Sequence, residues 1–326
     1  MNKVYERITA KEEDIARRLQ EWRPEKIDLQ RIPQGDVPGE RVEIRETQIG
    51  RAETLFREMI KTLPAMISEN PYQRVVLAVC GGSGVGKTSI AALLACFFRQ
   101  AQIGCYVLSG DNYPHRFPKY NDAERLHIYR ECGIQGMIRD GVYTPDNFVK
   151  LQQWQQAGED ADPAHLKDAG WFRSYADAGR KGLEGYLGTE KEIAFGEVGD
   201  IITAFKDGAV KIWLKRMGRQ ETELWYEEVD FRDIQVLLIE WTHGNSDSLT
   251  GVDFPVLLNS TPQETMAYRK ARNRDGASDS PFTTMVLEIE QGQLMKQAGK
   301  AKLIMSKSGG LLTYEELCRS QGERQV

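Results

Sequence analysis

The sequence predicts an α/β fold in which helices cover both faces of a parallel β-sheet. A short apolar run rich in β-branched residues, at 74–80, leads into a glycine-rich run and then a stretch of helical periodicity. Three further apolar runs follow at 105–108, 234–240 and 252–259. Strands that are apolar along their whole length are typical of parallel sheets buried on both faces. Segments with a helical pattern lie between successive apolar runs, and they supply the crossover connections that such a sheet needs.

Composition narrows the functional classes. The chain has 326 residues, and 43 basic against 48 acidic side chains give a net charge of −5. This balance argues against a general nucleic-acid or membrane-surface role. No apolar stretch approaches the roughly 18 residues that span a bilayer, and the five cysteines show no Cys-x-x-Cys spacing. We therefore expect reduced thiols, a cytoplasmic location, and neither nucleic-acid nor membrane partners.

Residues 1–70 are expected to form a helical N-terminal extension. Pro24, Pro33 and Pro38 interrupt the helical pattern, which indicates a helix, a loop and a second helix. One face of the second helix is apolar, and its members are Ile49, Ala52, Leu55, Phe56, Met59, Ile60 and Leu63. This face predicts packing on the core just before the first strand. The alternative is a solvated or oligomer-forming arm.

The glycine-rich run at 81–88 matches the pattern G-x-x-x-x-G-K-[ST] at every fixed position. Glycines let successive backbone N–H groups surround an anion, and the following helix adds the positive end of its dipole. Lys87 is expected to reach the β- and γ-phosphates of ATP, and Thr88 to bind Mg²⁺. The expected nucleotide contacts are Gly81, Gly82, Ser83, Gly84, Val85, Gly86, Lys87, Thr88 and Ser89. The alternative is a glycine turn that joins two elements without a nucleotide. The fold prediction is thus a phosphate-loop NTPase-type sheet.

One acid follows the end of a predicted strand and another is the last residue of one, at the edge where parallel sheets place their chemistry. Asp111 is a candidate general base for an acceptor hydroxyl, and Glu240 a candidate acid of the Mg²⁺ shell. The alternatives are a turn or capping aspartate and an ordinary strand-end glutamate.

Later elements complete the predicted architecture. Alternating residues at 209–217 and 222–227 flank the turn residues 218–220, which predicts a β-hairpin. Residues 261–264, Thr-Pro-Gln-Glu, form a capping box that opens a helix through Asn273, and a short strand is expected at 302–305. We expect residues 71–326 to form the main domain, with an acceptor-side insertion at 143–230.

Basic residues crowd the end of the capped helix. Arg269, Arg272 and Arg274 precede a glycine- and serine-rich loop, which indicates a lid at 269–284. Closure would place their guanidinium groups on the phosphoryl oxygens during transfer. A structural role in complementing the helix dipole is the alternative.

Other side chains are candidates for contact with the acceptor. They are Tyr113, His115, Arg116, Arg173 and His243. A lone histidine is as often a packed or solvated side chain as a ligand contact, and most surface arginines are simply solvated.

In the order of these parts the chain resembles the phosphoribulokinase and uridine kinase family. Gly110-Asp111 is similar to that family's strand-end aspartate, and Glu240-Trp241-Thr242-His243-Gly244 to its later acid and loop. The segment 172–175 is similar to the substrate side of the phosphoribulokinase branch. The resemblance covers roughly residues 72–310 and implies an ATP- and Mg²⁺-dependent transfer of the γ-phosphoryl group to a hydroxyl of a small polar metabolite. The resemblance to this family also implies a homodimer.

The resemblance leaves the acceptor open among sugars, sugar phosphates, polyols, nucleosides and vitamin precursors. Trp241 stands where the family usually has glycine, and Pro114 separates Tyr113 from His115, so the acceptor pocket differs. Adenylylsulfate kinases are a weaker resemblance, through Gly110-Asp111-Asn112. A nucleotide-dependent regulatory or scaffold protein is the alternative from another class. The Asn-Lys-x-Asp motif of GTPases is absent from the sequence.

Overall fold

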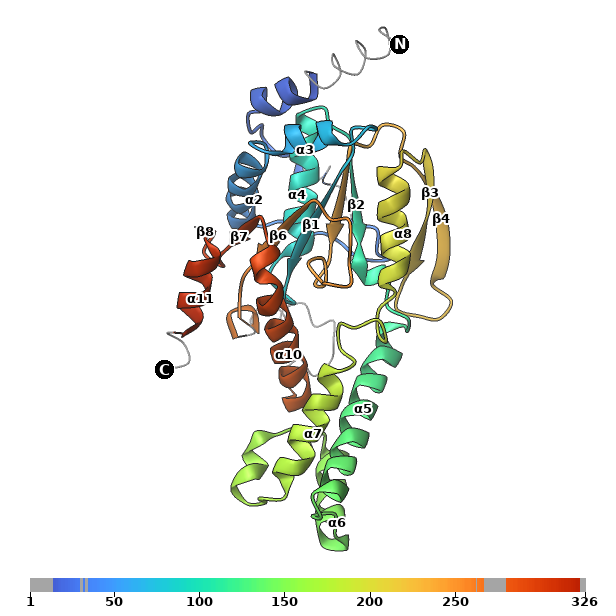
Figure 1. Cartoon of the computed structure of the whole chain (residues 1–326), viewed down its shortest axis with the longest axis vertical. Helices are drawn as coiled ribbons and strands as arrows, with labels where there is room; N and C mark the ends of the chain where they lie inside the picture. Colours follow the sequence, from blue (N-terminus) through green and yellow to red (C-terminus); the bar gives the residue numbers. More distant parts are fainter. Residues whose placement is uncertain (1–13, 30–31, 33–34, 262, 267–279, 323–326) are drawn as a thin grey trace. The chain divides into compact units, whose positions relative to one another are not determined.

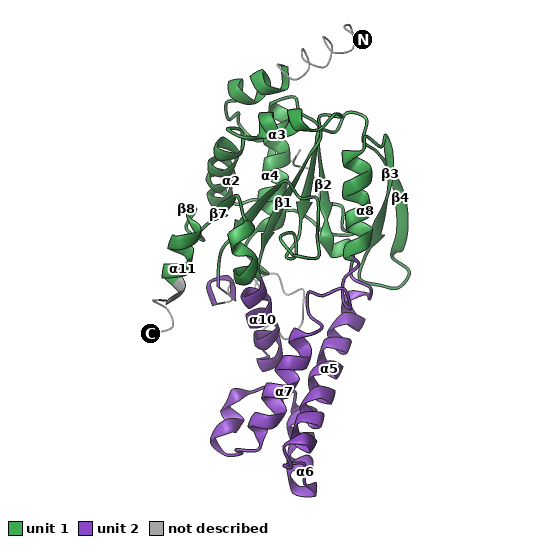
Figure 2. Cartoon of the chain, in the orientation of Figure 1, with its two compact units in different colours: residues 1–113, 195–260, 294–326 green, residues 114–194, 261–293 purple. Residues whose placement is uncertain are grey.

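The computed structural model describes residues 14–29, 32, 35–261, 263–266 and 280–322. Contacts between residues divide the chain into two compact units (Figure 2). Unit 1 comprises Met1–Tyr113, Phe195–Ser260 and Leu294–Val326, and unit 2 comprises Pro114–Ala194 and Thr261–Gln293. The domain boundaries expected from the sequence stay a prediction.

Unit 1 contains a six-stranded sheet in the order β2-β5-β1-β6-β7-β8 (Figure 1). The strands are β1 (Val75–Gly81), β2 (Cys105–Ser109), β5 (Val236–Glu240), β6 (Phe254–Leu258), β7 (Leu303–Met305) and β8 (Leu311–Leu312). The first five pair in parallel, and β8 pairs antiparallel with β7. The predicted class, a mostly parallel α/β sheet, is confirmed.

Strand β1 lies at the centre of this sheet. Val79 pairs with Glu240 on one side, and Gly81 pairs with Leu258 on the other. The chain leaves β1 through α4 (Lys87–Gln100) and returns as β2, beyond β5. It later places β6 on the opposite side of β1. Such a reversal of strand order opens a crevice at the carboxyl ends of the strands, where ligands of open α/β sheets bind.

One face of the sheet is covered by α2 (Glu46–Met59) and α4. The alternate residues Val75, Leu77 and Val79 of β1 belong to the same buried cluster as the apolar faces of these two helices. The helix residues of that cluster include Leu55, Phe56, Met59, Leu93, Leu94 and Phe97. The expectation that the second N-terminal helix packs on the core is therefore confirmed.

The opposite face is covered by elements from later in the sequence. Cys80 and Leu257 pack with Leu294, Ala298 and Leu317, which lie at the end of α10 (Pro281–Gln297), in η4 (Ala298–Lys300) and in α11 (Tyr314–Gly322). Helix α8 (Phe195–Lys206) also contacts β1 and β3. Because β1 is fully buried along its length, its uniformly apolar sequence is explained.

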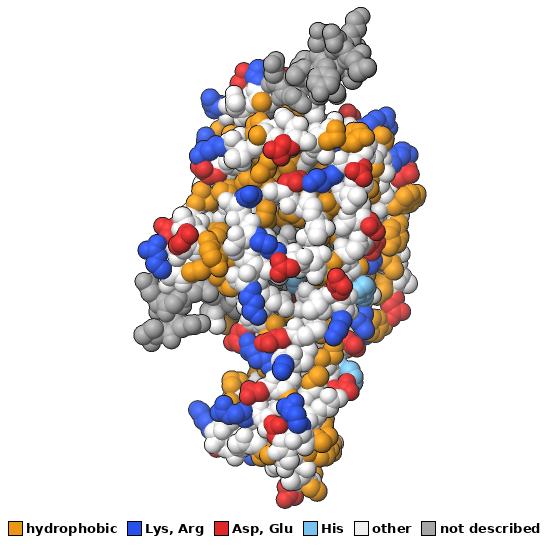
Figure 3. All heavy atoms as spheres, viewed as in Figure 1, with side chains coloured by type: hydrophobic (Ala, Val, Ile, Leu, Met, Phe, Trp, Pro, Cys, Tyr) orange, Lys and Arg blue, Asp and Glu red, His pale blue; other side chains and the backbone are white. Residues whose placement is uncertain are grey.

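The predicted hairpin is present as β3 (Lys211–Met217) and β4 (Leu224–Asp230), a separate two-stranded antiparallel sheet. It carries exposed aromatic residues, among them Trp213, Trp225 and Tyr226. On the face shown in Figure 3, hydrophobic side chains gather where Figure 1 draws β3 and β4, and elsewhere basic and acidic side chains are interspersed.

The N-terminal part of unit 1 contributes to the same core. Residues 14–21 are helical, and α3 (Leu63–Glu69) precedes β1. The ring of Trp22 lies 4.6 Å from that of Phe56 and 5.1 Å from that of Phe97 on α4, measured between centroids. Edge-on aromatic contacts of this kind add to the free energy gained by burial.

Unit 2 is helical and is built around the pair α5 (Pro118–Arg139) and α7 (Phe172–Glu184), with α6 (Pro145–Ala157), η3 (Pro163–Lys167) and most of α10. Glycines lie where α5 and α7 meet: a Cβ on Gly179 would stand 2.7 Å from the ring of Tyr129, and a Cβ on Gly133 2.6 Å from the ring of Tyr175. The helices therefore approach each other closely.

Two further expectations concern the later part of the chain. The capping box is confirmed, because Thr261 N donates to Glu264 Oε2 at 2.8 Å and Glu264 N donates to Thr261 Oγ1 at 3.2 Å. The rest of that helix, to Asn273, lies outside the described residues. Within the part of the chain that the structure describes, no helix is long and apolar enough to cross a membrane.

Candidate functional site

The glycine-rich loop joins the carboxyl end of β1 to the first turn of α4, as the sequence predicts. Its backbone is left-handed at three glycines, Gly81 (φ 150°), Gly84 (φ 77°) and Gly86 (φ 100°). A Cβ on Gly81 would also stand 2.5 Å from the carbonyl oxygen of Leu258. Side chains are therefore disfavoured at these glycines, and the loop's backbone N–H groups lie at the N-terminus of a helix, an arrangement suited to phosphate.

Thr88 and Glu240 are brought together by the fold. Thr88 is the second residue of α4 and Glu240 the last of β5, and Thr88 Oγ1 donates to Glu240 Oε1 at 3.2 Å. The other carboxylate oxygen of Glu240 accepts from Ser109 Oγ at 3.3 Å, at the end of β2. Three neighbouring elements thus converge on one carboxylate at the carboxyl edge of the sheet.

The Glu240 carboxyl is almost completely buried, with 3% of its surface exposed. Burial raises its pKa well above the usual range of a glutamate, because the charged form loses water. The positive charge of Lys87 opposes this rise in pKa, whereas the negative charges of Asp111 and Glu40 add to it. A buried acid with two other acids near it is stabilised by a cation beyond Lys87, so this corner of unit 1 is suited to one.

Asp111 lies in the short 3₁₀ turn η2 (Gly110–Asn112), directly after β2, and its side chain is exposed. Its backbone N–H donates to Ser109 Oγ at 3.4 Å. A Cβ on the neighbouring Gly110 would stand 1.9 Å from Cγ of Trp241, so the indole ring fills the space beside the turn. Trp241 thereby supports the backbone that carries Asp111, which gives its departure from the family pattern a structural reason.

The donor set at this corner fits Mg²⁺. A threonine hydroxyl and a carboxylate oxygen are hard oxygen donors, which Mg²⁺ prefers. Among the described residues, no group of three or more His, Cys, Asp or Glu side chains is placed to hold a metal ion. Mg²⁺ usually binds through one or two carboxylates together with phosphates and water, so a nucleotide would supply the remaining ligands.

Lys87 begins α4, and its ammonium group stays within the loop, where Nζ donates to the carbonyl oxygen of Gly82 at 3.4 Å. This contact keeps the cation beside the loop backbone. Lysine in this position neutralises the charge of transferred phosphate.

The N-terminal part of the chain borders the phosphate loop, which the sequence did not indicate. The carbonyl oxygen of Glu43 accepts from Ser89 Oγ at 2.9 Å, and Arg51 donates to the carbonyl oxygen of Val85 at 3.5 Å. A Cβ on Gly86 would stand 3.0 Å from Nε2 of Gln48. The segment before α2 and the first turns of α2 therefore help to position the loop.

Asp36, from the same segment, is a second residue that sequence reasoning missed. Its Oδ1 accepts from the backbone N–H of Ser109 at 2.8 Å and from Asn112 Nδ2 at 3.0 Å. Its Oδ2 accepts from Arg216 on β3 at 3.1 Å. Burial raises its pKa to about 6, and the cation of Arg216 limits the rise. Its position between Pro33 and Pro38 in the sequence is typical of a loop, so no periodic signal marked it.

The remaining predicted site residues are distributed over both units. Tyr113 is fully buried in unit 1, where burial raises its pKa, and His243 packs edge-on to Trp241 at 5.6 Å between ring centroids. In unit 2, His115 Nε2 lies 2.9 Å from the carbonyl oxygen of Glu190, and Arg116 donates to Tyr186 Oη at 3.0 Å.

Arg173 is also in unit 2 and is exposed on α7. The lid residues Arg269, Arg272 and Arg274 lie outside the described residues. The roles expected of all these residues in binding and catalysis stay predictions.

Comparison with known proteins supports the kinase resemblance. The chain is 42% identical, over 247 residues and 76% of its length, to the bifunctional alpha-galactosidase/sucrose kinase AgaSK of Mediterraneibacter gnavus. The predicted resemblance to phosphate-loop small-molecule kinases is confirmed. The chain spans about a fifth of that relative's length, 21%. No protein-family model matches the chain.

Two solved structures are also similar to the chain. One is a protein assigned as a fructose transport system kinase from a Silicibacter species, with 15% identity, a TM-score of 0.38, and coverage of 73% of this chain and 92% of that one. The other is a protein assigned as a uridine kinase from Bacillus stearothermophilus, with 16% identity, a TM-score of 0.35, and coverage of 78% and 96%.

Proposed function

We propose that the chain is an ATP- and Mg²⁺-dependent kinase that transfers the γ-phosphoryl group to a hydroxyl of a small polar metabolite, and that the acceptor is a sugar. The observation that carries the proposal is the hydrogen bond between Thr88 and the buried Glu240, 3.2 Å long, directly beside a phosphate loop. A loop that served only as a turn would need neither the hydroxyl nor the acid in this place.

Each residue of the corner has a distinct part in the proposed reaction. The loop amides and Lys87 bind and orient the phosphates, which is the main contribution that a kinase makes to phosphoryl transfer. Thr88 and Glu240 hold the Mg²⁺ ion, which when bound neutralises charge on the β- and γ-phosphates. Asp111 accepts the proton of the attacking hydroxyl.

The relative narrows the acceptor class. Its printed name includes a sucrose kinase, and the 42% identity extends over three quarters of this chain. Neutral sugars are therefore the first acceptors to test, ahead of nucleosides, sugar phosphates and adenylylsulfate. Arg269, Arg272 and Arg274 of the expected lid are proposed to act on the phosphoryl group once it is bound.

The deciding experiment is an ATP-consumption screen over phosphorylatable metabolites, with sucrose, fructose, glucose, uridine and adenylylsulfate in the first set. Lys87→Ala is the loss-of-function control, and we expect it to lower turnover by at least about 10²-fold because the phosphates lose their main cation. Lys61→Ala is the matched control, since Lys61 is an exposed surface lysine paired with Glu58.

The screen has clear outcomes. Phosphorylated sugar that forms with wild type and Lys61→Ala but not with Lys87→Ala supports the proposal. Activity that survives in Lys87→Ala belongs to a contaminant. Nucleotide binding without turnover on any acceptor would instead favour the regulatory or scaffold alternative.

A further inference from the structure

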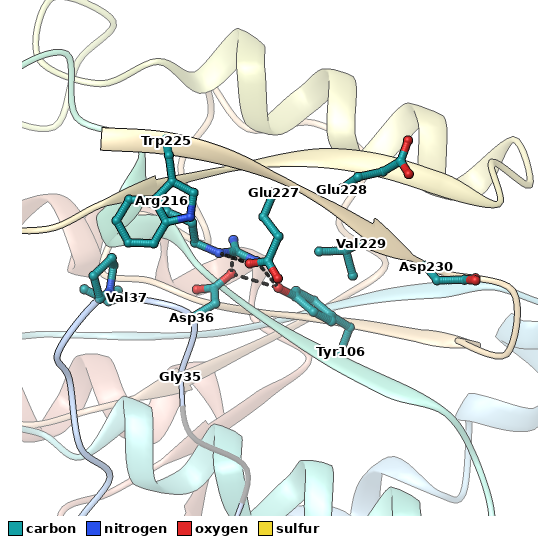
Figure 4. A pocket seen from close by; sticks show the side chains of 11 residues that line it. Gly35, Asp36, Val37, Tyr106, Arg216, Trp225, Glu227, Glu228, Val229 and Asp230 are labelled. Carbon is teal, nitrogen blue, oxygen red and sulfur yellow. Dashed lines mark hydrogen bonds and ion pairs between the residues drawn. The ribbon is translucent and has the colours of Figure 1, made fainter. Parts of the chain in front are cut away.

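A cavity of about 540 Å³ lies in unit 1 between strand β2, the hairpin and the N-terminal segment (Figure 4). Its lining residues are Gly35, Asp36, Val37, Pro38, Tyr106, Arg216, Trp225, Glu227, Glu228, Val229 and Asp230. Small-molecule sites in proteins typically have volumes of about 300–1,000 Å³. None of the roles proposed above for phosphate, Mg²⁺ or the catalytic base uses these side chains.

The hairpin presents one face to this cavity. Trp225, Glu227 and Val229 alternate along β4, so they share a face, and Arg216 pairs directly with Trp225 across the hairpin. Figure 4 shows Glu227 directed toward Arg216 and Tyr106, whereas Glu228 points away. Trp213 belongs to the alternate set of β3, which is the opposite face of the hairpin.

The polar groups of the cavity form one hydrogen-bonded cluster. Arg216 Nε donates to Glu227 Oε2 at 3.1 Å, and Arg216 donates to Asp36 Oδ2 at 3.1 Å and to Tyr106 Oη at 2.7 Å. Tyr106 Oη in turn donates to Asp36 Oδ2 at 3.3 Å. The side chain of Arg216 is 6% exposed, so the position of its guanidinium is set by these partners. Donors and acceptors therefore stand side by side in fixed places.

A ligand with hydroxyl groups suits such a lining. Each hydroxyl both donates and accepts a hydrogen bond, so it can bridge a carboxylate and a guanidinium or phenol. A cationic amine only donates, so it could not accept a hydrogen bond from Arg216 or Tyr106. Trp225 adds a large apolar surface, 46% exposed, on which the C–H face of a sugar ring can pack.

Charge disfavours anionic ligands in the same cavity. Arg216 is the only cation among the lining residues that the structure describes, and two carboxylates, Asp36 and Glu227, already share it. Glu228 and Asp230 add negative charge at the rim, although Lys211 and Arg232 pair with them. A phosphate group would lie beside acids without a cation of its own, which costs binding free energy.

We propose that this cavity binds the acceptor as a neutral sugar, with Trp225 as the stacking surface and Glu227, Arg216 and Asp36 as the hydroxyl-binding groups. The proposal rests on the kinase function proposed above and adds to it that a free sugar is preferred to a sugar phosphate. Asp36 also bonds to Ser109, whose hydroxyl contacts Glu240, so the cavity wall is continuous with the phosphate corner. The N-terminal segment thereby becomes part of the substrate site.

The first test is sugar binding without ATP, measured by isothermal titration with sucrose, glucose and glucose 6-phosphate. We expect the free sugars to bind wild type and the phosphorylated sugar to bind at least about tenfold more weakly. Trp225→Ala is expected to weaken binding of the sugars about tenfold or more. Trp213→Ala is the matched control, because it removes an exposed tryptophan, 61% exposed, from the other face of the same hairpin.

The second test is steady-state kinetics with the sugar that turns over best. Trp225→Ala and Glu227→Gln should raise the KM for the sugar about tenfold while the KM for ATP stays within about twofold of wild type. A merely structural role would change both constants and the unfolding transition together. Circular dichroism of each variant shows whether it is folded.

The two proposals can fail separately. If wild type turns over ATP with a sugar but Trp225→Ala and Glu227→Gln keep the sugar KM, the cavity is not the acceptor site and the kinase function stands. If no sugar supports turnover but titration shows sugar binding that Trp225→Ala removes, the cavity binds sugar and the kinase function is overturned. Binding of glucose 6-phosphate as tight as that of glucose, or absence of sugar binding to wild type, overturns the cavity proposal.

Discussion

Thr88 and Glu240 stand 152 positions apart in the sequence, yet their side chains are hydrogen bonded at 3.2 Å in unit 1. The pairing of β1 with β5 brings them together, because Val79, two residues before the phosphate loop begins, lies opposite Glu240. The acid is thus held by a strand of the central sheet and the hydroxyl by the first turn of α4. A site built on rigid elements keeps its geometry well.

Removing the hydroxyl of Thr88 or the carboxylate of Glu240 should impair the same Mg²⁺-dependent step of phosphoryl transfer. We expect Thr88→Val and Glu240→Gln each to lower kcat about 10²-fold and to raise the Mg²⁺ concentration needed for half-maximal rate. The double variant should be little worse than the worse single variant, since both hold one ion. Steady-state rates over a Mg²⁺ series measure this. Losses that simply multiply would argue against a shared metal.

Asp111 is predicted to act as the base toward the acceptor hydroxyl. Asp111→Asn should lower kcat about 10²–10⁴-fold and leave ATP binding nearly unchanged, because the amide cannot accept the proton. Asp247→Asn is the matched control in unit 1, since its side chain is 83% exposed and pairs only at the surface with Lys300. Near-wild-type turnover in Asp111→Asn would remove Asp111 from this role.

Asp36 should make the stability of the chain depend on pH. Burial raises its pKa from 3.8 to about 6, so the fold favours the protonated form. The stabilisation from that proton is complete below about pH 4 and is lost as the pH rises through 6. The shift corresponds to about 3 kcal/mol.

Asp36→Asn lacks this titration. Its free energy of unfolding, compared with that of wild type, should therefore rise by up to about 3 kcal/mol between pH 4 and pH 7. Urea unfolding of both proteins at several pH values, followed by tryptophan fluorescence, measures the difference. A constant difference over this interval would show that Asp36 keeps an ordinary pKa in the folded chain.

The contact between α5 and α7 in unit 2 should tolerate no added carbon atom at Gly179. A Cβ there would stand 2.7 Å from both the ring and the carbonyl oxygen of Tyr129, so Gly179→Ala should destabilise the protein by about 1–3 kcal/mol. Gly199→Ala in α8 is the matched control, because no atom lies within 4 Å of its Cβ position. That helix position should gain about 0.5–1 kcal/mol. Thermal unfolding distinguishes the two, and equal effects would contradict the packing argument.

Much of unit 1 could be predicted from local pattern. The apolar runs that became β1, β5 and β6 are each buried on both faces, and β2 is half-buried at its start and buried at its end, so all four carry a local apolar signal. The hairpin was equally clear, because residues on β3 alternate between exposed and buried at its start. By contrast, β8 has only two residues, Leu311 and Leu312, too few for a periodic pattern.

Residues of the candidate site could be predicted where they belong to a local sequence motif. They could not be predicted where their role depends on contacts that form only in the folded chain. The phosphate loop and Asp111 follow strands that could be recognised, Glu240 ends another, and unit 1 brings all three to one edge. Asp36 could not be found in this way, since its importance comes from Ser109, Asn112 and Arg216, which are distant in the sequence. The sequence around a carboxylate in a proline-rich loop does not indicate which residues it will bond to in the folded chain.

The central place of β1 has a consequence for how the protein is made. Its two neighbours, β5 and β6, begin at Val236 and Phe254, long after Val75. During synthesis this apolar strand must therefore leave the ribosome and wait for about half of the chain before either edge is paired. Chains with such distant strand pairing fold slowly, and until the strands pair they expose apolar, aggregation-prone segments. Nascent chains that end before β5 should accordingly depend on chaperones to stay in solution.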